Sequence, residues 1–229
     1  MKYMEIRDLI DSELKKYSHN QLIPSERYLA MKYHCSRETI RKAYEQLRAE
    51  DKIYKVQNVG WFVSNKKIQY YPTSTDNFNG YVSAQGFKIR TELISTHIVK
   101  DFEGIQHFDI AHQEQGFVEI VRLRYADDVP VLLSYNYLPL KLFPNILEHD
   151  IISSVQEVVM HQYNVPYTSS QLKIKNTAVA KEDLHHLGVP PNQTAIYIER
   201  ISKSSDQVIE YDVEIWPQDK IEMNLDIQG

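Results

Sequence analysis

The sequence predicts an α+β protein of two domains, and two observations lead to this prediction. Apolar residues recur at helical spacing up to residue 50, whereas runs rich in β-branched and aromatic residues, separated by polar breaks, follow residue 78. Formal charge divides similarly: residues 1–70 hold 14 Lys and Arg against 9 Asp and Glu, a balance of +5, so the net charge of −5 leaves −10 for the remainder. A small cationic helical domain therefore precedes an acidic domain built on a sheet.

The chain length and composition limit the class of protein. At 229 residues the chain can bury two modest cores, which we place at residues 1–65 and 78–229, with a polar linker at 66–77 in which strand character near 68–71 is left open. No apolar run approaches the ~20 residues of a membrane-spanning helix, and the first residues are too polar for a signal peptide. The single cysteine, Cys35, excludes an internal disulfide and suits a reducing compartment. We therefore expect a cytoplasmic protein.

Three amphipathic helices are expected in the first domain. The first spans residues 3–17, and its apolar residues at helical spacing are Ile6, Leu9, Ile10 and Leu14. The second begins after Ser25 and the third after Ser36, because a serine hydroxyl at these positions can accept an unpaired backbone N–H of the first turn. The buried stripe of the third helix consists of Ile40, Ala43, Tyr44 and Leu47.

The third helix carries cations away from its apolar stripe. Arg37 and Arg41 lie one turn apart near its N-terminus, which is the part of a helix-turn-helix that reaches bases and phosphates in the major groove. A surface helix with a solvated cationic face is the commoner origin of such a pattern. Arg27 in the second helix points outward as well, and an ion pair with Glu26 or Glu38 is the alternative to DNA contact.

A β-hairpin is expected after the third helix. Residues 52–56 and 61–63 read as strands around Gln57-Asn58-Val59-Gly60, where Asn and Gly tolerate the positive φ of a hairpin tip. Together with this hairpin, a set of residues resembles the winged helix-turn-helix signature of the GntR family of bacterial transcription regulators: Leu22, Pro24-Ser25-Glu26-Arg27, Leu29-Ala30, Ser36-Arg37, Thr39, Arg41, Ala43 and Leu47.

The resemblance implies that double-stranded DNA is a partner. The residues that it assigns to DNA binding are Ser25, Arg27, Ser36, Arg37, Thr39, Arg41, Lys42, Asn58 and Gly60. The family usually has Gly-x-Gly-Thr at the tip of the wing, where this chain has Asn58-Val59-Gly60-Trp61. Because the first glycine is missing, the depth to which the wing enters the minor groove stays open.

The second domain is expected to be a mainly antiparallel sheet with helices laid against it. The strand-like runs are Thr91–Val99, Gly116–Tyr125, Val129–Leu138, Gln171–Val179, Ala195–Lys203 and Val208–Trp216, with a tight hairpin at Asp127-Asp128. Helices are expected at residues 153–163 and at 181–187, the latter ended by Gly188.

Arg122 and Arg124 point to the same face of one predicted strand, and two guanidinium groups on a concave face suit an anion. Salt bridges to Glu119, Glu210 or Glu214 are the alternative. The run from Arg122 to Pro130, with Tyr137-Leu138-Pro139 and Ile209-Glu210-Tyr211, resembles the UTRA effector-binding domain of the HutC subfamily, which has a chorismate-lyase-like fold.

This second resemblance implies the residues of an effector site. In sugar-phosphate-responsive members, the positions of Arg122, Arg124, Ser154 and the backbone at Phe78-Asn79 hold the phosphate, and those of Ser134, Gln156, Glu210 and Trp216 contact the sugar. This chain departs from the family at Ser134, Gln156 and Asn79. The anion-binding half is therefore kept, whereas the half that reads the rest of the ligand is altered.

These observations predict a ligand-responsive transcription repressor that binds a palindromic operator as a homodimer and is released by a small anionic metabolite such as a sugar phosphate. A DNA-binding dimer whose C-terminal domain binds no ligand is the alternative. We expect no enzyme, because the sequence contains no nucleophile elbow or phosphate loop. We also expect no cofactor and no metal, since neither His107 with His112 nor His185 with His186 has the spacing of a helical zinc site.

Overall fold

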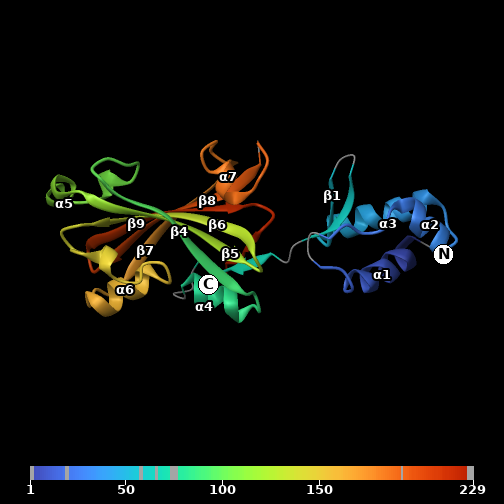
Figure 1. Ribbon diagram of the computed structural model, residues 1–229, viewed down its shortest axis with the longest axis horizontal. Helices are drawn as coiled ribbons and strands as arrows, with labels where there is room; N and C mark the ends of the chain where they lie inside the picture. Colours follow the sequence, from blue (N-terminus) through green and yellow to red (C-terminus); the bar gives the residue numbers. More distant parts are fainter. Residues whose placement is uncertain are drawn as a thin grey trace. The chain divides into compact units, whose positions relative to one another are not determined.

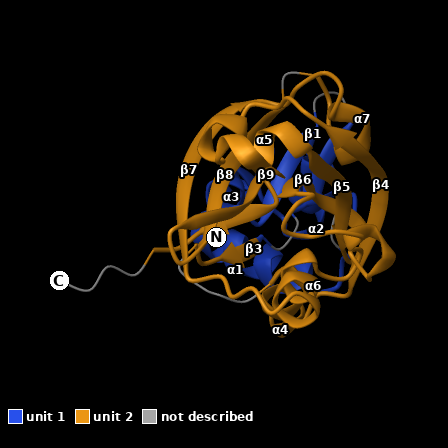
Figure 2. Ribbon diagram, turned by 90° about the vertical axis from the view of Figure 1, so that its left-hand side faces the viewer, with its two compact units in different colours: residues 1–67 blue, residues 68–229 orange. Residues whose placement is uncertain are grey.

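The structure is a computed structural model that describes residues 3–18, 21–56, 59–64, 67–72, 77–191 and 193–225. The chain separates into two compact units, Met1–Lys67 and Ile68–Gly229, which are coloured differently in Figure 2. Among the described residues, no helix combines the length and the apolar content that crossing a membrane requires.

The N-terminal unit consists of three helices and a hairpin, as the sequence predicts (Figure 1). Its elements are α1 (Tyr3–Leu14), α2 (Glu26–Lys32), α3 (Arg37–Ala49), β1 (Ile53–Val56) and β2 (Gly60–Val63). β1 and β2 pair antiparallel, and Leu22 adds a bridge to Phe62. The four predicted stripe residues of α3 are buried in one core with α1, α2 and the hairpin.

The first helix differs from its expected extent in two ways. It ends at Leu14, because the N–H groups of Lys16 and Tyr17 bond to carbonyls three residues back and tighten the chain into a turn. Leu9 is 43% exposed. The buried residues Ile6, Ile10 and Leu14 follow a spacing of four, so the core touches a stripe too narrow to include Leu9.

The C-terminal unit is built on a six-stranded sheet in the order β4-β5-β6-β9-β8-β7, with every neighbouring pair antiparallel. All six predicted strands are present, as β4 (Ile89–Val99), β5 (Phe117–Ala126), β6 (Val129–Pro139), β7 (Ser169–Ala178), β8 (Thr194–Ser204) and β9 (Gln207–Pro217). Asp127 and Asp128 both have positive φ, at 49° and 62°, which forms the predicted tight turn between β5 and β6.

A second, two-stranded sheet joins the two ends of this unit. β3 (Ile68–Tyr70) pairs parallel with β10 (Ile221–Met223), and the N–H of Ile68 donates to the carbonyl of Lys220. β3 lies within residues 66–77, the segment expected to be a linker. The sequence left a strand there open, and the structure forms one.

Helices cover both faces of the large sheet (Figure 1). α4 (Phe78–Ala84) and α6 (Val155–Gln162) lie on one face, where they pack in cores that include Trp216 and Ile120. α7 (Leu184–Leu187) lies on the other face, as does α5 (Ile110–Gln115). Two 3₁₀ turns, at Ile105–His107 and Ile146–Glu148, complete the described elements. The face under α4 and α6 carries the charged residues discussed below.

Candidate functional site

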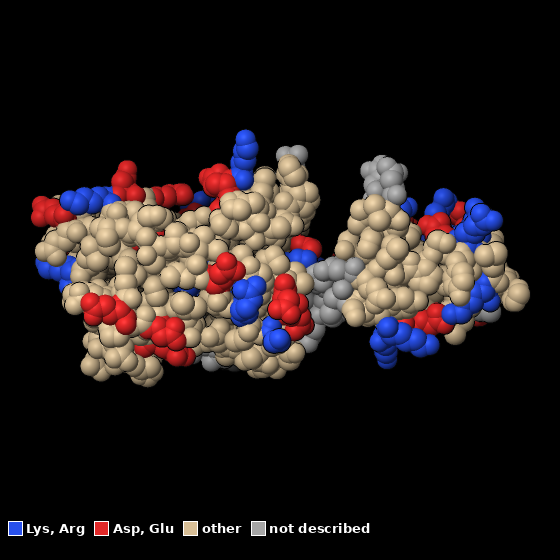
Figure 3. Space-filling model, viewed as in Figure 1, with Lys and Arg blue, Asp and Glu red and all other residues tan. Residues whose placement is uncertain are grey.

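The exposed side of α3 presents cations beside its N-terminus. Arg37, Arg41 and Lys42 are exposed, and Figure 3 shows Lys and Arg side chains gathered on the helical part of this unit. Ser36 caps the helix by accepting the Thr39 N–H at 3.1 Å, and the two hydroxyls are 2.8 Å apart. This cap fixes the first turn, and with it the direction in which Arg37 leaves the helix.

The basic residues differ in whether an acidic side chain pairs with them. Arg41 donates to Glu38 at 2.5 Å, an exposed pair that is worth little in water and that a phosphate can displace. Arg37 and Arg27 form no ion pair within the described part of the chain. Glu38 accepts a hydrogen bond from Arg41, and Glu26 accepts the indole N–H of Trp61 at 3.1 Å. Neither of the two acids that were expected as alternatives therefore forms an ion pair with Arg27 in the described structure.

The hairpin is held to the helices by Trp61 and Leu22. Trp61 is 4% exposed, and its ring centroid lies 5.1 Å from that of Tyr44, so the residue that departs from the family's wing pattern is a core residue. Gly60 has a φ of 153°, and a Cβ there would lie 2.7 Å from Leu22 Cδ1. Asn58, the other wing residue predicted to contact DNA, lies outside the described residues. Ser25 caps α2 by accepting the Tyr28 N–H at 3.3 Å.

A cavity of about 1030 Å³ opens on the sheet face beneath α4 and α6. Arg122 lies in its wall and is only 1% exposed. Its Nη1 donates to the carbonyl of Ile151 and its Nη2 to Asn136 Oδ1, both at 2.9 Å, whereas Nε has no hydrogen-bond partner among the described residues. Burial and the neighbouring Arg124 lower the pKa of Arg122 to about 9. An anion beside these two cations would offset both effects.

Arg124 is the second cation of this wall. Its guanidinium carbon lies 4.8 Å from the centre of the Phe78 ring, and its Nε is buried without a hydrogen-bond partner in the described part of the chain. Burial lowers the pKa of Arg124. Within the described residues, neither Arg122 nor Arg124 forms an ion pair with a carboxylate, so the alternative of salt bridges to Glu119, Glu210 or Glu214 is not what the structure contains.

The N-terminal ends of α4 and α6 are tied together beside this wall. Asn77, which caps α4, donates to Glu157 Oε1 at 2.6 Å, and Asn79 donates to the carbonyl of Ser153 at 3.1 Å. Ser154 caps α6 by accepting the Glu157 N–H at 3.1 Å. The positive end of the α6 dipole therefore lies at the cavity, together with the Glu157 carboxylate of the same turn.

The structure brings together six of the nine residues predicted for the effector site. The six that line the cavity are Phe78, Arg122, Arg124, Ser154, Gln156 and Glu210. The other three do not line it. Asn79 donates a hydrogen bond to the Ser153 carbonyl and so links α4 to the start of α6. Trp216 is fully buried against Tyr70 and Phe78. Ser134 is 2% exposed, and its Oγ has no hydrogen-bond partner among the described residues.

The cavity has a second charged group that the sequence did not single out. Arg200 on β8 lies with its Nε 3.7 Å from Asp212 and its Nη2 3.9 Å from Glu214, and it donates a hydrogen bond to the Tyr70 hydroxyl. Burial raises the pKa of Asp212. The alternation of Glu210, Asp212 and Glu214 along β9 was a visible signal, because period-two acids share one face of a strand.

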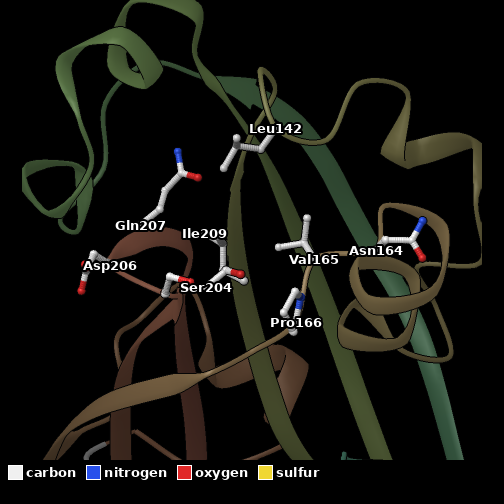
Figure 4. A pocket seen from close by; sticks show the side chains of 9 residues that line it. Leu142, Asn164, Val165, Pro166, Ser204, Asp206, Gln207 and Ile209 are labelled. Atoms are coloured by element: carbon white, nitrogen blue, oxygen red, sulfur yellow. The ribbon is translucent and has the colours of Figure 1, made fainter.

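Another pocket of about 490 Å³ lies between the β8–β9 turn and the segment after α6 (Figure 4). Its walls include the apolar side chains of Leu142, Val165 and Ile209, and its one ionisable lining residue, Asp206, is exposed. The polar residues that also line it, such as Asn164, Ser204 and Gln207, include no cation, so this pocket suits an anion less well than the larger cavity does. Among the described residues, no three His, Cys, Asp or Glu side chains are grouped so that they could hold a metal ion.

Comparison with known proteins agrees with this two-part arrangement. The model of the gntR family of bacterial regulatory proteins matches residues 2–63, and the UTRA domain model matches residues 84–222. Two relatives from Bacillus subtilis strain 168 are similar over most of their length. The uncharacterized HTH-type transcriptional regulator YurK is 28% identical over 79% of this chain and 76% of its own, and the HTH-type transcriptional repressor NagR is 22% identical over 86% and 82%.

A solved structure shows the same fold. The crystal structure of PhnF from Mycobacterium smegmatis superposes with a TM-score of 0.70 at 18% identity, and the match covers 97% of this chain and 99% of that one. Both units of the fold are therefore shared with a solved protein.

Proposed function

Since this chain belongs to the GntR family of bacterial regulatory proteins, we propose that it is a repressor controlled by a small anionic metabolite. It is a transcription regulator of the GntR/HutC type with a UTRA domain, not an enzyme. The observation that carries the proposal is the pair of buried, unpartnered Nε atoms of Arg122 and Arg124 at one cavity. Buried donors without acceptors are costly, and an anionic ligand supplies the acceptors.

The DNA-binding part of the proposal rests on the exposed cations of α2 and α3. We infer that two protomers place two α3 helices in successive major grooves of a palindromic operator, because half-site symmetry mirrors the two-fold symmetry of a dimer. The proposed site consists of Ser25, Arg27, Ser36, Arg37, Thr39, Arg41, Lys42, Asn58 and Gly60. The proposed place of action is the cytoplasm.

The ligand part rests on the cavity. A phosphorylated sugar is the favoured class, since its phosphate suits the Arg122 and Arg124 end and its hydroxyls suit polar residues such as Gln156 and Glu210. The ligand lowers operator affinity only if it binds the non-competent state of the protein more tightly, and couplings of ~1–3 kcal/mol correspond to ~5- to 150-fold. A thermal-shift screen with sugar phosphates tests this part, because a ligand at 100 times its Kd adds ~2.7 kcal/mol of stability.

Ligands found in that screen are then added to the operator complex. Release of the operator is the expected result. A protein that no sugar phosphate or other small anion stabilises would instead be a DNA-binding dimer with an empty C-terminal domain, which is the alternative function.

Arg37→Ala is expected to weaken operator binding by ~1–3 kcal/mol and to reduce the slope of log affinity against log salt by about 1 if Arg37 contacts phosphate. The reason is that Arg37 is exposed, uncompensated by an acid in the described chain, and fixed near the α3 N-terminus. Fluorescence anisotropy with operator DNA at several salt concentrations measures both quantities.

Arg48→Ala is the matched control, because Arg48 is also an exposed α3 arginine but lies in the last turn, paired with Glu45 at 3.2 Å. Equal losses in the two variants would indicate a general charge effect and would remove Arg37 from the reading surface.

A further inference from the structure

The charges of the large cavity are separated in space. Its lining includes three arginines, Arg122, Arg124 and Arg200, and four carboxyl groups: Glu157 at the start of α6, and Glu210, Asp212 and Glu214 on β9. Arg122 and Arg124 lie on β5, and neither forms an ion pair with a carboxylate of the described residues. The three acids lie on β9, two strands away, because β6 separates β5 from β9. At a spacing of ~4.8 Å per strand, the two groups of backbone atoms are about 10 Å apart.

The acidic end places two carboxyl groups, those of Asp212 and Glu214, beside a single cation. Glu210 is satisfied locally, since it accepts from Asn136 Nδ2 at 2.7 Å and from the Tyr167 hydroxyl at 2.6 Å. Asp212 and Glu214 share one guanidinium, that of Arg200, at separations of 3.7 and 3.9 Å that are too long for hydrogen bonds. One cation therefore serves two carboxyl groups, of which Glu214 also accepts the indole N–H of Trp216 at 3.0 Å.

Asp212 is the residue most in need of a donor. It is 5% exposed, it lines the cavity, and no described residue donates a hydrogen bond to it. The basic wall gives an independent indication, since the Nε atoms of Arg122 and Arg124 are buried and have no hydrogen-bond partner among the described residues. Both walls of the cavity thus contain polar groups that the described part of the protein does not satisfy, which is costly unless a ligand or water pairs with them.

We propose that the ligand of this cavity is zwitterionic, with its anionic group on Arg122 and Arg124 and a protonated amine on Asp212 and Glu214. The inference rests on the proposed effector function and narrows its ligand class, because a plain phosphate ester complements only the basic half of the cavity. An ammonium group supplies up to three donors and one positive charge, which provides the donor that Asp212 lacks and favours the ionised form of its carboxyl group.

Matched pairs of small probes test the amine directly. The full-length protein is titrated with ω-aminoalkyl phosphates of three to six carbons and with n-alkyl phosphates of the same lengths, by isothermal calorimetry. At the length that spans the two walls, the amine is expected to raise affinity about tenfold, equivalent to ~1.4 kcal/mol. Equal affinities of the two series at every length would overturn the proposal.

Variants locate the effect. Asp212→Asn and Glu214→Gln are each expected to reduce the advantage of the aminoalkyl phosphates at least severalfold, whereas Glu199→Gln is expected to leave both series unchanged. Glu199 is the control because it lies on the neighbouring strand β8 but on the opposite face, paired with Lys175. An amine preference that persists in both Asp212→Asn and Glu214→Gln would show that the acidic wall does not read the amine.

The proposed function and this inference fail in different ways. If neither series binds and inorganic phosphate does not bind, the anion site itself is absent, and both proposals fall together. If the alkyl phosphates bind and release the operator as well as the aminoalkyl phosphates do, the anion-controlled repressor stands and the zwitterionic ligand alone is overturned.

Discussion

Arg124→Gln is expected to abolish the release of operator DNA by an anionic ligand while the ligand-free protein binds the operator as before. Arg124 contributes a cation to the cavity wall, and its guanidinium lies over the Phe78 ring. A buried charged group that binds an anion contributes several kcal/mol to the free energy of binding. Its loss is therefore expected to abolish ligand binding rather than to weaken it slightly. Operator binding with and without ligand, followed by fluorescence anisotropy, measures the response.

Arg90→Gln is the matched control. Arg90 is an exposed arginine of the neighbouring strand β4, and its guanidinium carbon lies 3.5 Å from the centre of the Tyr125 ring, so it too stacks on an aromatic side chain without lining the cavity. A normal ligand response in Arg124→Gln would show that the anion binds elsewhere.

The neighbouring residue Arg122 is a poorer target for the same test. Its two Nη groups satisfy the Ile151 carbonyl and Asn136 Oδ1, so Arg122→Ala leaves both acceptors unpaired inside the protein. Each unpaired buried group costs ~1–3 kcal/mol, and the variant therefore loses stability as well as ligand. Loss of response in Arg122→Ala alone would not separate a missing ligand contact from a damaged fold.

Ile40→Ala is expected to destabilise the N-terminal unit by ~2–5 kcal/mol and to abolish operator binding at ordinary temperature. Ile40 is fully buried where α3 packs in the core of this unit. A unit of this size has a stability of only ~5 kcal/mol or so, because small domains bury a small fraction of their surface. A cavity of this size therefore removes most of the stability that keeps α3 folded.

Urea titration followed by tryptophan fluorescence measures this change, since the chain has 2 Trp, one in each unit: Trp61 and Trp216. The transition of the N-terminal unit is expected to move to lower urea, while that of the C-terminal unit stays in place. Leu9→Ala is the control, because its side chain is largely exposed and its loss is expected to cost less than ~0.5 kcal/mol. Similar losses in the two variants would contradict the assigned core.

Local patterns were sufficient to predict most of the fold. The stripe of α3 and the six strands of the large sheet each repeat at the period of their own secondary structure, so a short window of sequence contains the whole signal. β3 and β10 have no such signal. They are three residues each, and Gln69 bonds to Glu222 from 153 residues away, so only the assembled sheet shows that these segments pair.

The site was predictable where a family pattern or a strand period marks it, as for Arg122 and Arg124. Resemblance could not show what each side chain already does in the fold. Trp61 departs from the family's sequence pattern at the wing tip, but in the structure it packs on Tyr44 in the core. Arg200 and Tyr70 come from segments 130 residues apart, and their contact in the cavity wall follows from the sheet order, which the sequence leaves open.

The pairing of β3 with β10 has a consequence for how the protein is made. A ribosome adds ~5–20 residues per second, so β3 leaves the exit tunnel many seconds before its partner strand has been synthesised. The helices of the N-terminal unit have their complete sequence by then and can fold on the nascent chain. The ligand cavity, whose wall includes Tyr70 of β3, closes only when the last part of the chain is released. Newly made molecules are thus expected to complete the helix-turn-helix unit before the unit that contains the proposed effector site.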